Sequence, residues 1–146
     1  MDIEKFYING SFVEPNGKDK IDLINPATEE SVGSVISGNQ KDVDAAVEAA
    51  VNSFELASNL TLEQKKVILQ EIIDGMHSRK EEFAQIISDE MGAPIKVAKG
   101  AQFASGYIHF VNTLKVIDSF KFSEVHDNIT INKLPIGPVG MITPWN

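Results

Sequence analysis

Residues 134–146 contain the feature that most constrains how this chain can fold. Their sequence is Leu-Pro-Ile-Gly-Pro-Val-Gly-Met-Ile-Thr-Pro-Trp-Asn. Proline and glycine interrupt the first half, so the apolar run at residues 139–143 is predicted to be a separate strand. That strand leads directly into Pro144, Trp145 and Asn146. Open α/β sheets bind ligands beyond the carboxyl ends of their strands, which makes this end a candidate site.

The three residues after this strand have two interpretations. In the structural one, Trp145 anchors a core and Asn146 caps the strand end, and spacing alone favours it. In the catalytic one, the Asn146 amide donates a hydrogen bond to a developing alkoxide, which is worth on the order of 3 kcal/mol when preorganised. Pro144 would then fix the backbone so that the amide is aimed in advance.

The composition limits the classes of protein to which this chain can belong. Its 146 residues are 42% hydrophobic and 23% charged, which suits one packed domain or a piece of a larger protein. A net charge of −8 argues against a nucleic-acid surface, and no apolar run approaches the roughly 20 residues of a membrane span. The absence of cysteine excludes a thiol nucleophile within these residues and fits a reducing cytoplasm. We therefore expect a cytoplasmic protein with neither a nucleic-acid nor a membrane partner.

The first part of the sequence is typical of β-structure. Asn9-Gly10 predicts a tight hairpin turn, because both turn positions need a positive φ. Strands are expected on either side of it, at residues 5–8 and 11–14. Two further strands are expected at residues 20–24 and 31–37.

Three amphipathic helices follow, each marked by an N-cap residue and a polar partner three residues later. These pairs are Asn39 with Asp42, Thr61 with Gln64, and Ser78 with Glu81. The first helix has an apolar stripe consisting of Val43, Ala46, Val47, Ala50, Val51 and Phe54. Asp42 and Asp44 are expected on its solvated face. Gly92 suits the left-handed C′ position after the third helix.

A fourth helix is predicted at residues 94–117. It is apolar on more than one side, which is typical of a helix buried between layers. It is too apolar for the outside of a small domain, so we expect packing partners beyond these residues. Two strands follow, at residues 120–125 and 129–134, and each has an apolar face available to pair with another chain.

Spacing reveals no metal or phosphate site. His77, His109 and His126 have no second ligand at a metal-binding distance in sequence, so no metal is predicted. The run Gly137-Pro138-Val139-Gly140 precedes its strand, unlike a dinucleotide-binding fingerprint, which follows one. Residues 142–146 are therefore the candidate site.

Five short motifs occur in an order that matches a known family. They are Phe6-Tyr7-Ile8-Asn9-Gly10, Asn25-Pro26-Ala27-Thr28, Asp42-Val43-Asp44-Ala45-Ala46-Val47, Glu90-Met91-Gly92-Ala93-Pro94 and Pro138-Val139-Gly140-Met141-Ile142-Thr143-Pro144-Trp145-Asn146. Each of the early motifs is weak alone, but their order and spacing, ending in Pro-Trp-Asn, are specific. Over nearly its whole length the chain resembles the N-terminal part of the NAD(P)-dependent aldehyde dehydrogenase superfamily.

The resemblance implies an α/β fold of β-hairpins, four helices, oligomerisation strands and the first strand of a Rossmann-type cofactor sheet. Residues 1–119 would supply N-terminal strands and helices of the cofactor-binding domain. Residues 120–135 would be oligomerisation strands that build a homodimer or homotetramer. Residues 136–146 would form the first, incomplete part of the nucleotide-binding sheet.

The resemblance also implies that the parent protein oxidises a small-molecule aldehyde to a carboxylate with NAD⁺, or with NADP⁺, through a cysteine thioester. Asn146 would be the catalytic oxyanion donor. The positions implied to line the cofactor are Ile142, Thr143, Pro144 and Trp145. The nucleophilic cysteine and the base glutamate belong to later segments in the family, so this chain alone is predicted to be inactive.

Two alternatives stay open at this point. One is a semialdehyde dehydrogenase that passes its acyl group to coenzyme A instead of water. The other is a non-catalytic structural or oligomerisation relative that lacks the nucleophile. Some relatives also place a monovalent cation near the positions of the Ile24 backbone and Glu90.

Overall fold

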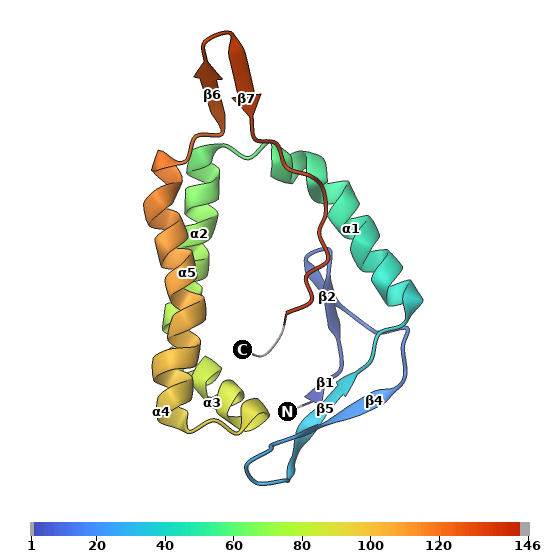
Figure 1. The fold of residues 1–146 in the computed structure, drawn as a ribbon. Coiled ribbons are helices and arrows are strands. Elements are labelled where there is room, and N and C mark those ends of the chain that lie inside the picture. The colour runs from blue at the N-terminus through green and yellow to red at the C-terminus, as the bar shows by residue number, and fades with distance from the viewer. Residues whose placement is uncertain (1, 144–146) are drawn as a thin grey trace.

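The computed structural model describes residues 2–143, which form two arms joined into an open ring (Figure 1). One arm contains the N-terminal strands and helix α1, and the other contains the remaining helices. The hairpin β6–β7 projects from one end of the ring. At the opposite end, the turn between β4 and β5 lies against the end of α3, since a Cβ on Gly92 would lie 2.9 Å from the Ala27 backbone nitrogen.

The strands form three small sheets. They are β1 (Asp2–Ile3), β2 (Phe6–Ile8), β3 (Ser11–Val13), β4 (Lys20–Ile24), β5 (Ser31–Ile36), β6 (Ser123–His126) and β7 (Ile129–Asn132). The first sheet has the order β1-β5-β4, with β1 parallel and β4 antiparallel to β5. The hairpins β2–β3 and β6–β7 each stand alone. The predicted hairpin turn is confirmed, because Asn9 and Gly10 have φ values of 51° and 77°.

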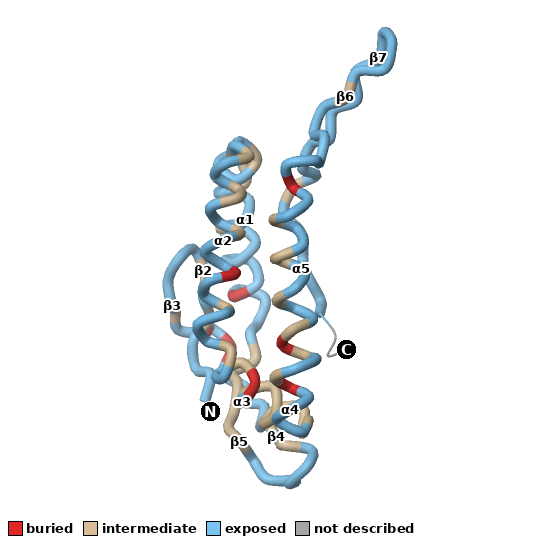
Figure 2. The backbone as a smooth tube through the Cα atoms, turned by 90° about the vertical axis from the view of Figure 1, so that its left-hand side faces the viewer, coloured by how far each residue is buried: buried red, intermediate tan, exposed pale blue. Residues whose placement is uncertain are grey.

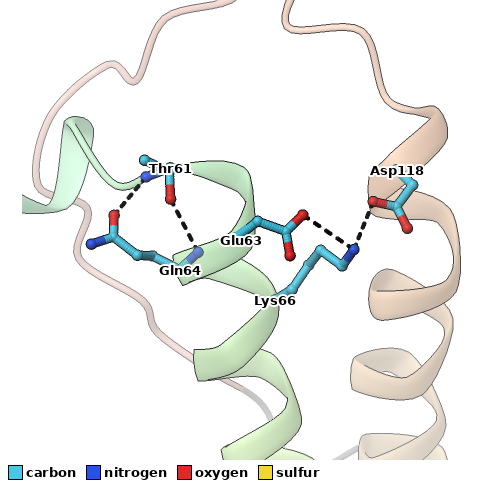
Figure 3. Close-up of polar contacts among 5 residues, drawn as sticks. All are labelled: Thr61, Glu63, Gln64, Lys66 and Asp118. Atoms are coloured by element: carbon cyan, nitrogen blue, oxygen red, sulfur yellow. Dashed lines mark hydrogen bonds and ion pairs between the residues drawn. The ribbon is translucent and has the colours of Figure 1, made fainter.

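The helices follow their capping signals in two of three cases. They are α1 (Gln40–Ser58), α2 (Leu62–Ser78), α3 (Lys80–Met91), α4 (Ile95–Val97) and α5 (Phe103–Val116). The capping boxes at Asn39 and Thr61 are both present, the second drawn in Figure 3. The predicted cap at Ser78 is wrong. Ser78 is the last residue of α2, and its hydroxyl donates to the Gly75 carbonyl at 3.0 Å, so it is not available to α3.

The expected fourth helix at residues 94–117 is divided into several segments. A π-helical turn, Ala98–Gln102, separates α4 from α5, and a 3₁₀ turn, η2 (Ile117–Ser119), ends the segment. The left-handed Gly92 after α3 is confirmed, with φ 67°. A π-turn accommodates an extra residue, so the side chains before and after it are rotated onto different faces. This rotation explains why one regular apolar stripe does not run through the whole segment.

The core lies between α2, α3 and α5 and is small (Figure 2). The buried apolar side chains within residues 2–143 are Ile73, Ala84, Ala98, Phe103 and Ile117. The Phe83 and Phe103 rings lie 5.7 Å apart at its centre. Phe103 is only 5% exposed. A self-contained hydrophobic cluster therefore holds this arm together.

Helix α1 has no comparable cover. Val43, Val47 and Val51, from its predicted apolar stripe, are each 53% exposed. The stripe has the expected helical spacing, and β2 of the β2–β3 hairpin packs beside part of it, at Val43 and Ala46. An exposed apolar face of this size costs free energy unless something covers it. The expectation of packing partners beyond these residues accords with this face.

The strand predicted at residues 139–143 is not formed in this structure. Residues 133–143 contain no helix or strand, and they run from β7 back toward the middle of the molecule (Figure 1). A β-strand exists only through hydrogen bonds to a neighbour, and none of the strands described within residues 2–143 pairs with this segment. Its assignment to a nucleotide-binding sheet, like the other domain assignments, stays a prediction.

Candidate functional site

The candidate site segment is exposed where the structure describes it. Ile142 is fully exposed and Met141 is 84% exposed. Neither Ile142 nor Thr143 makes a hydrogen bond or ion pair with another residue of the described range 2–143. Pro144, Trp145 and Asn146 lie outside the described residues, so the proposed amide donor has no geometry to compare. Of the predicted site residues, the structure describes Ile142 and Thr143, and it gives these two no polar partner within residues 2–143.

This exposed segment fits a cofactor wall in one limited respect. An extended backbone with an apolar side chain and no internal hydrogen bonds can lie flat against a planar ring and offer it N–H and C=O groups. Ile142 meets the part of this description that concerns an exposed apolar side chain. Such a wall also needs an opposite side to enclose the ring.

The base of the β6–β7 hairpin holds an aromatic cluster that spacing did not predict. The Phe120 and Phe122 rings meet edge to face, with centroids 4.8 Å apart. Lys65 of α2 lies over the Phe122 ring at 4.8 Å, and Lys133 lies over the Phe120 ring at 5.0 Å. A partly apolar pocket next to these rings is also lined by Leu134 and by the start of α2. The alternation of Phe120 and Phe122 was visible in the sequence, but the pairing with two lysines from distant positions was not.

Asp42 has an environment opposite to the one predicted. Its side chain is only 5% exposed, whereas it was expected on a solvated helix face. Its carboxylate accepts backbone N–H groups from Asn16 at 2.7 Å, Gly17 at 2.9 Å and Asn39 at 2.9 Å, and the Asn16 side-chain amide at 3.1 Å. Burial opposes the charged form, but these hydrogen bonds outweigh it and hold the pKa of Asp42 well below its ordinary value.

The Asp42 cluster is structural rather than catalytic. All of its acceptor capacity is used to join the turn at Asn16 and Gly17 to the first turn of α1. A carboxylate at this place also complements the helix dipole. The sequence contained the capping-box pair Asn39 and Asp42 and, 25 residues before Asp42, the turn residue Gly17. The fold was needed to bring these two segments together.

The described residues form no metal cluster. Within residues 2–143, no three His, Cys, Asp or Glu side chains lie close enough together to hold a metal ion. The fold does bring the region of Ile24 near that of Glu90, because the turn after β4 packs against Gly92. This proximity adds no further ligand to the two positions that the resemblance suggested.

Comparison with known proteins identifies the family. The sequence profile of the aldehyde dehydrogenase family matches residues 12–146. Proteins of several Staphylococcus aureus strains, provisionally named aldehyde dehydrogenases, are similar. The one from strain bovine RF122 / ET3-1 is 39% identical over 145 residues, which are 99% of this chain and 30% of that protein. This chain belongs to the aldehyde dehydrogenase family, and it spans about 30% of the length of the curated relatives that it matches.

Solved structures agree with this assignment. Aldehyde dehydrogenase C from Pseudomonas syringae, a mutant complexed with NAD⁺ and octanal, superposes with a TM-score of 0.88 at 37% identity, covering 91% of this chain and 27% of that one. An aldehyde dehydrogenase from Bartonella henselae gives a TM-score of 0.84 at 32% identity, covering 88% and 27%. The two-arm arrangement is therefore the arrangement of the matching part of these enzymes. The mixed strand-and-helix fold class predicted from the sequence is confirmed.

No helix within residues 2–143 has both the length and the apolar character needed to cross a membrane.

Proposed function

We propose that this chain acts as the N-terminal part of an enzyme that oxidises an aldehyde to a carboxylate with NAD⁺ or NADP⁺. The observation that carries this proposal is the family match over residues 12–146. It is supported by the 37% identical Pseudomonas syringae enzyme, whose structure contains NAD⁺ and octanal. The proposed substrate is accordingly a small or medium organic aldehyde, and the nicotinamide cofactor accepts the hydride.

Within this proposal, Asn146 is the oxyanion donor, and residues 142–145 form part of the wall beside the cofactor. The chain contains no cysteine, so a thiolate that attacks the aldehyde has to come from outside these 146 residues. The contribution of this chain is then to orient and to stabilise charge, because a side-chain amide can donate to an alkoxide without changing its own protonation. The exposed Ile142 would provide an apolar contact to the cofactor.

The test uses a protein of family length that carries this chain. Asn146→Ala should lower kcat for aldehyde oxidation by roughly 10²- to 10³-fold, as expected for the loss of one oxyanion donor. Asn112→Ala is the matched control, because Asn112 is an exposed asparagine on α5. An unchanged rate for the Asn146 variant would exclude the oxyanion role. Assaying the product with and without coenzyme A separates hydrolysis from acyl transfer, and no activity at all would favour a non-catalytic relative.

The 146-residue chain by itself provides a second test. Isothermal titration calorimetry should detect no NAD⁺ binding, because one exposed wall cannot desolvate a cofactor. Tight binding by a monomer would contradict the proposal that the site is completed elsewhere.

The partner proposed for the β6–β7 hairpin is a second copy of the chain. Val125 and Ile129 are 70% and 65% exposed on this hairpin, and a two-stranded hairpin alone is marginally stable in water. Pairing its edge with another hairpin would satisfy the edge hydrogen bonds and cover these side chains. Sedimentation velocity on the parent protein, with Val125→Lys as the variant, should reveal a dimer or tetramer that the variant weakens.

A further inference from the structure

The path of residues 134–143 depends on what holds the hairpin exit in place. The hairpin entry is anchored to the helical arm. Lys66 of α2 donates to the Asp118 carboxylate at 3.0 Å (Figure 3), and the Phe120 backbone N–H donates to Ile117 at 3.3 Å. The Asp118 contact raises the pKa of Lys66, so this lysine stays charged. Chain entry into β6 is thus fixed relative to α2 and α5.

The hairpin exit has one fastening residue, Lys133. Its backbone N–H donates to the Phe122 carbonyl at 2.8 Å. Its ammonium donates to the Lys121 carbonyl at 2.7 Å and to the Glu124 carboxylate at 2.5 Å. The same ammonium lies over the Phe120 ring. One side chain therefore contacts three successive parts of the entry strand.

The charges around Lys133 favour its contacts with the entry of the hairpin. The hydrogen bond from Lys133 lowers the pKa of Glu124 below its ordinary value, so the carboxylate is charged at neutral pH. Glu124 also lies 3.7 Å from His126. The pair is partly exposed, with 42% of the Lys133 side chain open to solvent, so each single contact is weak. The combination of a carbonyl, a carboxylate and an aromatic face fixes the direction of the side chain more than any one of them.

Beyond Lys133 the chain has no comparable attachment. Within residues 134–143, no side chain or backbone group makes a hydrogen bond or ion pair with another described residue. Leu134 is 82% exposed and Ile136 is 94% exposed. Lys133 is therefore the last described residue before this segment whose hydrogen bonds tie it to the entry of the hairpin.

We propose that Lys133 is a positioning residue that sets the direction in which the chain leaves the β6–β7 hairpin and, with it, the starting direction of the path toward Ile142 and Thr143 of the proposed site. The second half of this statement rests on the proposed function, whereas the first half does not. Lys133 touches neither substrate nor cofactor in this scheme. It acts by tying the exit of the hairpin to its entry, which the helical arm holds.

The absence of cysteine makes the direct test simple, since two introduced cysteines can be spin-labelled without background. The labels replace Leu134, which is 82% exposed, and Asn112, an exposed residue of α5, so that the measured distance joins the exit of the hairpin to α5. Double electron–electron resonance should give a narrow distance distribution in the otherwise unchanged chain. In Lys133→Met the distribution should broaden, because the exit of the hairpin then loses its contacts with Lys121, Glu124 and Phe120.

Three companion variants decide between positioning and general destabilisation. Lys133→Arg keeps a cation that can donate to the same partners, so it should restore the narrow distribution. Lys115→Met removes an exposed lysine of α5 and should change nothing. If Lys133→Met proves unfolded by circular dichroism, Phe120→Leu removes only the ring beneath the ammonium and should broaden the distribution to a lesser extent.

The proposal is overturned if Lys133→Met keeps the narrow distribution while folded, or if Lys133→Arg is as broad as Lys133→Met. A distribution that is already broad in the unsubstituted chain would overturn it as well. These distances do not depend on aldehyde oxidation, so failure of the proposed function would leave the result on Lys133 unaffected.

Discussion

The helical arm and the segment at residues 133–143 differ in how they are held. Helices α2, α3 and α5 bury Phe103 and Ile73 against each other. The segment buries nothing comparable, and Ile142 is fully exposed at its end. The first region is stable through its own contacts, whereas the second needs a neighbouring strand to become regular. The comparison teaches that this chain separates its scaffold from its proposed site, and that the site is the part left to be completed.

The largest expected effect comes from breaking the scaffold itself. Phe103→Ala removes the most buried ring of the helical cluster, which is 5% exposed and contacts Phe83. It should lower the free energy of unfolding by about 3–5 kcal/mol in urea denaturation. Phe12→Ala is the control, because Phe12 is 71% exposed and its loss should have a small effect. Equal effects for the two variants would mean that the helical arm has no special core.

The next largest loss of stability is expected at the contact between Asp42 of α1 and the turn at Asn16 and Gly17. Asp42→Asn places amide hydrogens opposite the N–H donors of Gly17 and Asn39, so the melting temperature at pH 7 should fall by several degrees. Asp44→Asn, at an exposed position, should leave it nearly unchanged.

The hydrogen bonds of the Asp42 carboxylate also predict how the stability changes with pH. The pKa of Asp42 is lowered in the folded state, so its charge contributes stability at every pH above the ordinary value of about 3.9. This contribution is lost as the pH falls below that value toward the folded-state pKa. Melting temperatures measured from pH 7 to pH 2 should therefore fall more steeply for the unsubstituted chain than for Asp42→Asn. Parallel curves would contradict this assignment.

A smaller loss of stability is expected at the contact between Gly92 and the turn between β4 and β5. Gly92 has a φ of 67°, and a Cβ there would lie 3.0 Å from Pro26 Cγ. Gly92→Ala should cost about 1–3 kcal/mol in thermal or urea denaturation. Gly75→Ala is a control of opposite sign, because nothing lies within 4 Å of its Cβ position and alanine favours the helix by about 1 kcal/mol. If both variants were stabilising, the contact between the two arms would be absent in solution.

The smallest effect is predicted at the proposed site. Ile142→Ser should change the free energy of unfolding of this chain by no more than about 0.5 kcal/mol, because Ile142 contacts nothing that is buried. In a protein of family length the same change should weaken NAD⁺ binding, measured by fluorescence titration. A clear loss of stability in the isolated chain would show that the segment packs more closely than the structure indicates.

Sequence reasoning succeeded where a few neighbouring residues decide the conformation. Asn9 and Gly10 were enough for a hairpin, and Asn39 and Thr61 were enough for two helix starts. It failed at Ser78, where the same residue type can serve the helix before it or the helix after it. Both outcomes are local hydrogen bonds of similar energy, so the choice depends on how α2 and α3 meet.

Sequence reasoning also failed where distant segments decide the surroundings of a side chain. Asp42 was expected in solvent because carboxylates are rarely buried unless they are paired, but the turn at Asn16 covers it. Lys133 had no recognisable signal, since its partners are carbonyls and rings rather than a motif. For residues 142–146 the sequence pattern remains the main source of information, because most of that motif lies outside the described residues.

The sequence by itself determined the family, the first hairpin turn and two helix starts, because each depends on local patterns or on their order along the chain. It is also the source of the prediction that residues 142–146 form a site. The tertiary structure alone decided that Asp42 is buried, that α1 keeps an exposed apolar face, and that Lys133 contacts Lys121, Glu124 and Phe120 at the base of the hairpin. These features depend on which segments meet in space. Burial and hydrogen-bond energies change with such meetings, whereas turn and capping preferences do not.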